Sequence, residues 1–551
     1  MNEYQKIAEL LYPNVKDYTF YLDKYKKREN VKGEVTRYAP SPTGYMHIGN
    51  FFQMFISYNL AKNTNGVFIR RLEDTDRKRE KEGAFEVIEM VMDKFGIYPD
   101  EYETLNGEIK GDYGPYIQTE RLDIYHSFAK YLVSIGNAFP CFCKAFENKE
   151  EILKDRETKF LDNDATEYDA CRNLSFDEVK EHIDNGEKFA IRLKTSGDGI
   201  KRVTFTDLIK GEINANANAK DVILVKSDGI PPYTFCHIID DKLMGVTTVV
   251  RGEEYISSTP VHLDIIDALG FDRFKYCHNP LICKIPENGN KRKISKRYDP
   301  EADMRYYFEN GYPIESVLEY LLNLISSSFE EWRRNNPELS WKEFKFGIND
   351  ITAVSPIFDL VKLNDISKNI ISKMTAEEVF NNVLKWAKEY NNSWYELLLN
   401  NKDYAIKMFN IDRNIEKPRK DIYKWSSIPE LYKYFYDEFY NPSSIEDYDL
   451  PNNYKCAKEL LNEYLTIFDE NDAKDTWFNK IKELGSKYGF AKEVKEYKKN
   501  KEAYIGHCGD VCTLIRVAVT GRTQTPDLYE ILKLFGKEKI KNRFNKFYEF
   551  I

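Results

Sequence analysis

The spacing of hydrophobic residues near the start of the chain predicts a β-α-β unit. Residues 34–38 and 67–72 predict two short strands, and a loop rich in proline and glycine follows the first. The segment between them predicts a helix, because apolar side chains recur at helical spacing, at Ile48, Phe51, Phe52 and Phe55. This order of elements is typical of the opening of a parallel α/β sheet.

The pattern is interrupted after this unit and then resumes. Residues 131–220 lose the regular alternation and predict an inserted α/β module. Three apolar segments then predict strands that complete the interrupted sheet: 221–225, 233–239 and 245–250. A helix is predicted next, with Thr259 as its N-cap, Pro260 in its first turn and Gly270 at its end.

The two ends of the chain predict helices. Residues 1–30 predict one or two amphipathic helices, which we interpret as an N-terminal extension. Beyond about residue 300 the pattern is almost entirely helical. Thr375 and Glu378 have the spacing of a capping box, which predicts that a new helical domain starts there.

Length and composition indicate a soluble protein of several domains. At 551 residues the chain is too long for one hydrophobic core, so we expect two to four domains. Hydrophobic residues make up 42% and charged residues 31%, with no apolar run near the roughly 20 residues that span a bilayer. The N-terminal residues lack the features of a secretory signal, and the nine scattered cysteines fit reduced thiols. We therefore expect a cytoplasmic protein without membrane contact.

The charge distribution favours contact with nucleic acid at one place only. A net charge of -9 argues against a protein that coats nucleic acid indiscriminately. Basic side chains nevertheless crowd the last helical segment, at Lys533, Lys537, Lys539, Lys541, Arg543 and Lys546. A stripe of this kind binds a phosphate backbone, and a solvated helix face is the alternative interpretation.

Two loops carry candidate chemistry. RYAPSPTGYMHIGN, residues 37–50, ends the first strand and begins the first helix, where the free N–H groups and the helix dipole favour phosphate. His47 in this loop is a candidate donor to a phosphoryl oxygen. KRKISKR, residues 291–297, supplies cations that neutralise charge developing on a leaving pyrophosphate, although alone it also fits a solvated loop. Together they predict phosphoryl or nucleotidyl transfer.

These loops resemble the HIGH and KMSKS signatures of class I aminoacyl-tRNA synthetases. HIGN at 47–50 corresponds to the first and KISKR at 293–297 to the second. Other segments narrow the resemblance to bacterial glutamyl-tRNA synthetases: RRLEDTD (70–76), DGIPPYTF (228–235), VVRGEE (249–254) and RVAVTGRTQTPDL (516–528). The resemblance covers nearly everything after residue 30 and is loosest at 145–170 and 380–510.

The resemblance implies an α/β fold, with a Rossmann-like class I catalytic domain, an inserted acceptor-binding module and an all-α anticodon-binding region. The implied parts are an N-terminal extension (1–30), the two halves of the catalytic domain (31–130 and 221–297), the acceptor-stem-binding insertion (131–220), a stem-contact region (298–374) and the helical anticodon-binding domain (375–551).

The resemblance also implies the reaction, which is ATP-dependent ligation of L-glutamate to tRNA(Glu) through glutamyl-adenylate. We expect a monomer that uses ATP with Mg²⁺, and the Mg²⁺ bridges the phosphates without a dedicated protein cage. His47 and Gly49 would hold the nucleotide, and Lys296, with Lys293 nearby, would contact the triphosphate. Lys541 and Arg543 are the expected contacts to the tRNA backbone.

The implied glutamate pocket consists of Arg37, Ser41, Glu73, Tyr233 and Arg251. The two arginines would surround the substrate, and Glu73 is suited to meet its α-ammonium group. A planar guanidinium grips a carboxylate through two parallel hydrogen bonds, whereas a carboxamide presents N–H donors to it. The alternative for Arg251 is a structural ion pair, with Glu253, Glu254 or Asp240.

Some positions depart from the family pattern. The last residue of the first signature is Asn50, and Ile294 replaces the methionine of the second, and neither change puts the activity in doubt. Pro232 stands where threonine is usual, and His237 occupies a position that is asparagine in some relatives. We expect these two to alter the substrate pocket slightly.

Three cysteines resemble the zinc knuckle of some family members. Cys141 and Cys143 are followed by Cys171, but Asn173 stands where the family has its fourth ligand. Tetrahedral zinc requires four donors, and only three are evident unless Tyr168 or His182 substitutes. We therefore expect no metal site here.

Other functions remain open at this point. Glutaminyl-tRNA synthetases carry β-barrels in the C-terminal half, and the enzyme that glutamylates queuosine lacks that half, so a helical C-terminal half disfavours both. An inactive paralogue that binds tRNA is disfavoured by the two intact loops. A small-molecule nucleotidyltransferase would leave the helical region without a purpose.

Overall fold

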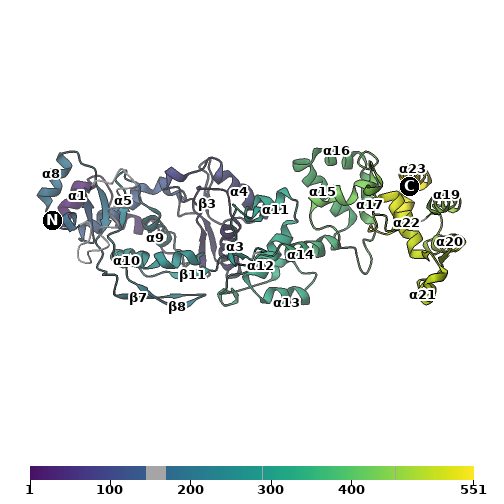
Figure 1. The fold of residues 1–551 in the computed structure, drawn as a ribbon. Coiled ribbons are helices and arrows are strands. Elements are labelled where there is room, and N and C mark those ends of the chain that lie inside the picture. Colours follow the sequence, from purple (N-terminus) through teal and green to yellow (C-terminus); the bar gives the residue numbers. More distant parts are fainter. Residues whose placement is uncertain (144–168, 288, 453–454) are drawn as a thin grey trace. The chain divides into compact units, whose positions relative to one another are not determined.

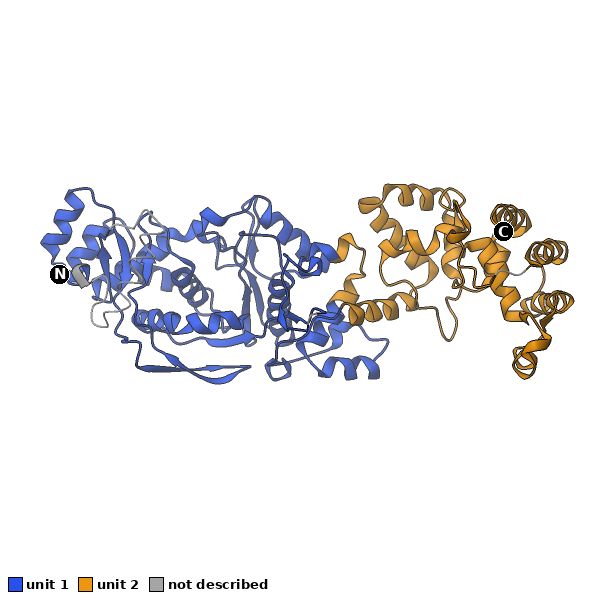
Figure 2. Ribbon diagram, in the orientation of Figure 1, with its two compact units in different colours: residues 1–306, 318–359 blue, residues 307–317, 360–551 orange. Residues whose placement is uncertain are grey.

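The computed structural model describes residues 1–143, 169–287, 289–452 and 455–551 (Figure 1). These residues form two compact units, which Figure 2 colours separately: residues 1–306 with 318–359, and residues 307–317 with 360–551. The first unit combines strands and helices, whereas the second is almost entirely helical. The predicted combination of an α/β part and a helical part is confirmed.

The elements have the following bounds. The helices before residue 340 are α1 (Glu3–Leu11), α2 (Tyr18–Lys24), α3 (Ile48–Asn63), α4 (Ala84–Phe95), α5 (Leu122–Ser134), α7 (Asp169–Arg172), α8 (Phe176–Asp184), α9 (Tyr233–Leu243), α10 (Thr259–Leu269), α11 (Arg305–Glu309), α12 (Ile314–Ile325) and α13 (Ser328–Asn335). The later ones are α14 (Leu360–Lys373), α15 (Ala376–Tyr390), α16 (Asn392–Asn400), α17 (Lys402–Asn410), α18 (Ile428–Tyr432), α19 (Ala457–Ile467), α20 (Lys474–Lys487), α21 (Val494–Lys499), α22 (Cys508–Thr520) and α23 (Leu528–Tyr548).

The strands are β1 (Val35–Tyr38), β2 (Val67–Arg70), β3 (Tyr102–Glu103), β4 (Ile109–Lys110), β5 (Ala138–Cys141), β6 (Ala190–Leu193), β7 (Arg202–Asp207), β8 (Gly211–Asn216), β9 (Ile223–Val225), β10 (Thr248–Gly252), β11 (Lys275–Asn279), β12 (Cys283–Lys284), β13 (Arg292–Lys293), β14 (Phe490–Ala491) and β15 (Gly506–His507). Of the strands in the described residues, β14 and β15 alone lie in the second unit.

Parallel strands form the centre of the first unit. β1 pairs with β2 in parallel, which confirms the predicted β-α-β unit. β10 pairs in parallel with β11, and β11 pairs in parallel with β7. The N–H of Thr247 donates to the carbonyl of Val35, so β10 lies beside β1. The carboxyl ends of β1 and β10 therefore lie at the same edge, which is where ligands bind in open α/β sheets.

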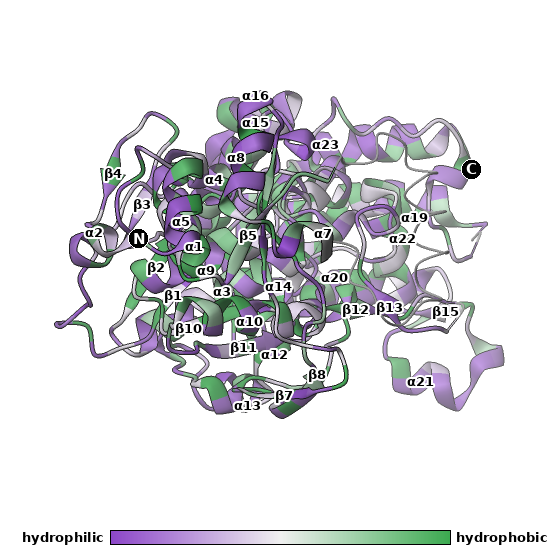
Figure 3. Cartoon of the chain, turned by 90° about the vertical axis from the view of Figure 1, so that its left-hand side faces the viewer, coloured by the Kyte–Doolittle hydropathy of each residue, from purple (hydrophilic) through white to green (hydrophobic). Residues whose placement is uncertain are grey.

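Helix α3 connects β1 to β2 and is buried within the first unit. Ten of its 16 residues are buried, and Figure 3 colours the whole chain by hydropathy. Its apolar residues pack against β1 and β2, the two strands that the helix connects. This packing fixes the helix start, and with it the loop that precedes the helix.

The strand predicted at residues 233–239 is wrong, because these residues begin helix α9. Pro232 is the N-cap, and Phe235, Ile238 and Ile239 recur at helical spacing on a helix that is buried on most sides. A continuous apolar run does not distinguish a buried helix from a buried strand. The change matters for the site, because it places Tyr233 at the start of a helix.

Three further predictions need correction. β9 occurs as predicted but pairs antiparallel with β6, in a separate sheet with β5. The segment predicted at 245–250 contributes β10 only from residue 248 onward. The N-cap of α10 is Ser258, because the hydroxyl of Thr259 donates to the carbonyl of Tyr255 instead. Gly270 ends that helix in the left-handed conformation, as predicted.

The N-terminal extension is confirmed as two helices. A capping box of Asn2 and Gln5 starts α1, which packs against α5 and α8. Arg28, which follows α2, forms an ion pair with Glu101 at 2.7 Å and donates to the carbonyl of Met244. The extension is therefore an integral part of the first unit.

The second unit has its own hydrophobic core. The predicted capping box of Thr375 and Glu378 is present at the start of α15. Helix α23 is kinked at Gly536, whose φ of 73° is positive, so the basic residues before and after it do not form one straight stripe. Within the described part of the chain, no helix has the length and apolar composition needed to cross a membrane.

Candidate active site

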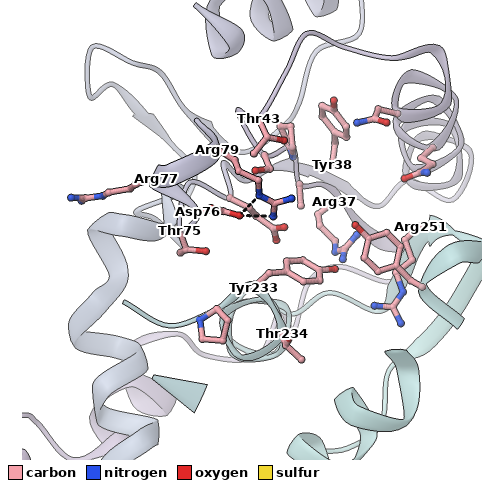
Figure 4. A pocket seen from close by; sticks show the side chains of 18 of the residues that line it. Arg37, Tyr38, Thr43, Thr75, Asp76, Arg77, Arg79, Tyr233, Thr234 and Arg251 are labelled. Carbon is pink, nitrogen blue, oxygen red and sulfur yellow. Dashed lines mark hydrogen bonds and ion pairs between the residues drawn. The ribbon is translucent and has the colours of Figure 1, made fainter. Parts of the chain in front are cut away.

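A cavity of about 880 Å³ opens at the carboxyl ends of β1 and β10 and at the start of α9. All five residues predicted for the glutamate pocket line it: Arg37, Ser41, Glu73, Tyr233 and Arg251. Figure 4 shows Arg37, Tyr233 and Arg251 close together, with Thr75 and Arg77 at the opposite side of the cavity.

One wall of the cavity is a buried network of charges. The carboxylate of Asp241 on α9 accepts from Arg37 at 3.1 Å and from Arg71 at 2.8 Å. Arg71 also donates to Glu73 at 3.0 Å. Arg37 thus already has a carboxylate partner, which reduces its capacity to hold a second one.

Glu73 is a buried carboxyl group whose protonated and ionised forms are both populated near pH 7. Burial raises the pKa of Glu73 to about 7, although Arg71 and Arg37 act in the opposite direction. Tyr233 lies nearby, and burial raises the pKa of its hydroxyl to about 12. The Tyr233 ring stacks on His237, with ring centroids 4.7 Å apart, and burial lowers the pKa of that histidine to about 4. The tyrosine and the histidine are therefore neutral at pH 7.

Arg251 differs from Arg37 because its partners in the chain are neutral. Its side chain is only 3% exposed and donates three hydrogen bonds of 2.9 Å, to His278, His262 and Thr259. The three acidic residues considered as ion-pair partners are engaged elsewhere: Glu253 with Lys210, Glu254 with Lys293, and Asp240 with Arg121. Within the described residues, Arg251 therefore presents an uncompensated positive charge to the cavity.

The first signature loop is held by His47, which is the N-cap of α3. Its Nδ1 accepts from the N–H of Gly49 at 2.9 Å, so in the neutral ring Nε2 carries the proton. A Cβ atom at Gly49 would lie 3.2 Å from His47 Nδ1, a tight contact that glycine avoids. Burial, together with Lys296 and Lys293, lowers the pKa of His47 to about 4. His47 is therefore a neutral hydrogen-bond donor at pH 7.

The second signature loop contacts the first directly. Lys296 donates to the carbonyl of Tyr45 and lies 3.7 Å from Asp303. Lys293 lies 3.7 Å from Glu254, in a second small cavity that His47 and Gly49 also line. Burial lowers the pKa of Lys296. The structure thus brings together all four residues that the sequence predicted to act on the nucleotide.

Comparison with known proteins identifies the family. A model described as "tRNA synthetases class I (E and Q), catalytic domain" matches residues 34–336, and "Anticodon binding domain" matches residues 378–548. The chain belongs to the class I tRNA synthetases.

The similarity to individual relatives extends over nearly the whole length of this synthetase. It is 43% identical to the glutamate–tRNA ligase of Acetivibrio thermocellus, over 99% of this chain and 100% of the relative. It is also 43% identical to that of Clostridium perfringens strain SM101, over 99% of each chain. A crystal structure of a glutamate tRNA ligase from Elizabethkingia meningosepticum, in complex with its amino acid, has a TM-score of 0.73 at 25% identity, covering 94% of this chain and 99% of that one.

The three cysteines that resemble a zinc knuckle lie together in this synthetase. The sulfur atoms of Cys141, Cys143 and Cys171 are all within 4.8 Å of one another. Asn173 accepts from Lys194, and His182 stacks on Phe142 and lies 3.1 Å from Glu187, whereas Tyr168 lies outside the described residues. The described part of the chain therefore offers three sulfur donors and no fourth ligand.

The two residues predicted to contact tRNA have different environments. Lys541 is exposed on α23. Arg543 is only 3% exposed, donates to Asp437 at 2.5 Å and lies 3.5 Å from the centre of the Tyr440 ring. A phosphate contact by Arg543 does not fit this placement, because the guanidinium is already held within the helical unit.

Sequence reasoning missed the residues around Arg251. His278 lies at the end of β11, in register with Arg251 on β10, while Thr259 and His262 come from the start of α10. A signal existed, because polar residues at the ends of adjacent parallel strands meet at one edge of a sheet. The strand at residues 275–279 was not predicted, so this signal was lost.

Proposed function

We propose that this synthetase attaches L-glutamate to tRNA(Glu) in an ATP-dependent reaction that proceeds through glutamyl-adenylate. The observation that carries the proposal is Arg251, a buried guanidinium without a carboxylate partner among the described residues, in a cavity beside the two signature loops. Removing an unpaired charge from water costs folding stability on the order of several kcal/mol. A bound ligand of opposite charge would offset this cost. The names of the relatives support the same conclusion.

In the first step an oxygen of the substrate's α-carboxylate attacks the α-phosphorus of ATP, and pyrophosphate leaves. His47 donates a hydrogen bond to the nucleotide, and Lys296 stabilises the negative charge of the triphosphate. Mg²⁺ supplies further charge neutralisation when it is bound with ATP. The 2′-hydroxyl of the terminal adenosine then attacks the activated carbonyl, and AMP leaves. The protein contributes alignment and electrostatic stabilisation, and none of its side chains forms a covalent bond to the substrate.

Selection of glutamate over glutamine is assigned to Arg251. A carboxylate accepts two charge-assisted hydrogen bonds from a guanidinium and compensates its charge. A carboxamide would leave the buried charge uncompensated and would direct N–H groups toward it. Such mismatches support discrimination of roughly 10³-fold or more without an editing site.

Glu73 is assigned to the α-ammonium group of the substrate. It lines the same cavity as Arg251, and its pKa of about 7 means that a bound ammonium favours the ionised form. Ser41 and Tyr233 complete the polar lining. Lys541 is assigned to a backbone phosphate of the tRNA, since it is exposed and basic. We further propose that the protein acts as a cytoplasmic monomer.

A test of this function is the formation of acid-precipitable glutamyl-tRNA. Purified protein, labelled glutamate and cognate tRNA should give a product that requires ATP, and Lys296→Ala should reduce its rate. A folded protein that binds tRNA but gives no product above background would instead support an inactive tRNA-binding relative.

A further inference from the structure

A buried aspartate–histidine pair contacts Arg251 without lining the cavity. His278 Nε2 accepts from Arg251 Nε at 2.9 Å, and His278 Nδ1 lies 2.7 Å from Asp207. The exposed fraction is 0% for His278 and 1% for Asp207. Neither residue touches the cavity, so any effect on a substrate must pass through Arg251.

The proton on His278 can be placed from the hydrogen bonds alone. A guanidinium only donates, so Nε2 of His278 must accept and the ring proton must be on Nδ1, directed at Asp207. Burial, together with the charge of Arg251, lowers the pKa of His278 although Asp207 opposes the shift. His278 is therefore neutral and held in one tautomer.

Asp207 is well suited to fix that tautomer. Its Oδ2 also accepts from the main-chain N–H of His278 at 2.9 Å, and its Oδ1 accepts from the N–H groups of Ile209 and Lys210. Burial alone would raise the pKa of Asp207, but these hydrogen bonds lower it. The carboxylate is ionised and held at four points, so it does not turn away from His278.

The imidazole also separates two opposite charges. A carboxylate in direct contact with Arg251 would compensate the guanidinium, as Asp241 does for Arg37. Here Asp207 holds the ring, and the ring holds Arg251 through a neutral acceptor. With His262 and Thr259 as the other acceptors, three of the five N–H bonds of Arg251 are used and two have no acceptor among the described residues.

We propose that Asp207 and His278 are positioning residues for substrate recognition, which act by fixing the orientation of Arg251 while leaving its charge available to the side-chain carboxylate of the amino acid. The inference rests on the proposed role of Arg251. It adds that Asp207, from the β7–β8 hairpin, sets the affinity and selectivity for the amino acid through an intervening histidine.

The central variant is Asp207→Asn. An asparagine that keeps its oxygen on the N–H groups of Ile209 and Lys210 presents its amide N–H to His278, which favours the opposite tautomer. Nε2 would then carry a proton directed at Arg251 Nε–H, and the hydrogen bond would be lost. We expect KM for glutamate to rise roughly ten- to hundredfold, the scale for one hydrogen bond to a charged group, while KM for ATP stays near the parent value.

Two substitutions at His278 test the same role independently. His278→Leu removes the acceptor and should raise KM for glutamate like Asp207→Asn. His278→Gln retains an amide oxygen for Arg251 and an N–H for Asp207, so it should restore most of the affinity. Selectivity for glutamate over glutamine should follow the same order, which a general loss of packing would not produce.

Asp221→Asn is the matched control. Asp221 is also buried, at 3% exposure, and is held by Arg172 and the N–H of Thr195 away from the cavity. This variant should lose thermal stability while keeping the parent KM for glutamate. Equal KM values for glutamate in Asp207→Asn, His278→Leu and Asp221→Asn would overturn the inference, as would a parallel rise in KM for ATP.

Failure of the proposed function is distinguishable from failure of this inference. If Arg251→Gln leaves KM for glutamate unchanged, the assignment of Arg251 is wrong. If Arg251→Gln raises it but Asp207→Asn and His278→Leu do not, only the positioning role is wrong.

Discussion

Replacing Arg251 with glutamine tests how the cavity selects its substrate. Arg251 is 3% exposed, and all of its hydrogen-bond partners within the described residues are neutral. Arg251→Gln removes the positive charge. The shorter amide side chain cannot donate to all three of the acceptors that Arg251 uses. Two N–H bonds of the Arg251 guanidinium have no acceptor among the described residues. We assign these two to the substrate carboxylate.

The size of the effect follows from those two bonds. A hydrogen bond between charged groups contributes about 1.5–3 kcal/mol, so the loss of two amounts to roughly 3–6 kcal/mol. Since each 1.4 kcal/mol corresponds to about a tenfold change, KM for glutamate should rise at least about 100-fold. ATP is assigned to the signature loops instead, so its KM should change little.

The assay is steady-state aminoacylation with glutamate and ATP varied separately. Arg413→Gln is a suitable control, because Arg413 is also buried but donates to main-chain carbonyls in the second unit. It should reduce stability and leave KM for glutamate unchanged. If Arg251→Gln changes the two Michaelis constants equally, or neither of them, Arg251 is a structural residue and the reasoning is refuted.

Three other predictions follow from the same structure. Lys296→Ala should lower the aminoacylation rate by roughly 10²–10³-fold with tRNA binding intact, and normal turnover would assign the catalytic cation elsewhere. Lys541→Ala should weaken tRNA binding and reduce its salt slope by about one, whereas Arg543→Ala should mainly destabilise the fold, by about 2 kcal/mol in thermal or denaturant unfolding. Since the ionised form of Glu73 binds an ammonium and its pKa is about 7, KM for glutamate should fall as pH rises from 6 to 8, and Glu73→Gln should remove this dependence.

The residues predicted for the pocket line one cavity, and short motifs at the ends of strands bring them there. Arg37 lies near the end of β1 and Arg251 near the end of β10, so their side chains meet at one edge of the sheet. The spacing within one motif placed His47 next to Gly49 at a helix start. In these cases local sequence determines the geometry.

Other features depend on contacts between distant segments. The acceptors of Arg251 come from β11 and α10, and Asp207 lies more than 40 residues before it in the sequence. Burial of Arg543 depends on Asp437 and Tyr440, which no pattern in α23 indicates. Helix α9 was predicted as a strand because a short apolar run fits a buried strand as well as a buried helix.

The most direct test of the central claim is a charging assay in which labelled glutamate and labelled glutamine are offered separately with purified tRNA(Glu) and tRNA(Gln). The account predicts ATP-dependent accumulation of glutamyl-tRNA(Glu), and a ratio of kcat/KM for glutamate over glutamine of about 10³ or more. Charging with glutamine at a comparable efficiency, or no charging of tRNA(Glu) by folded protein, would contradict it.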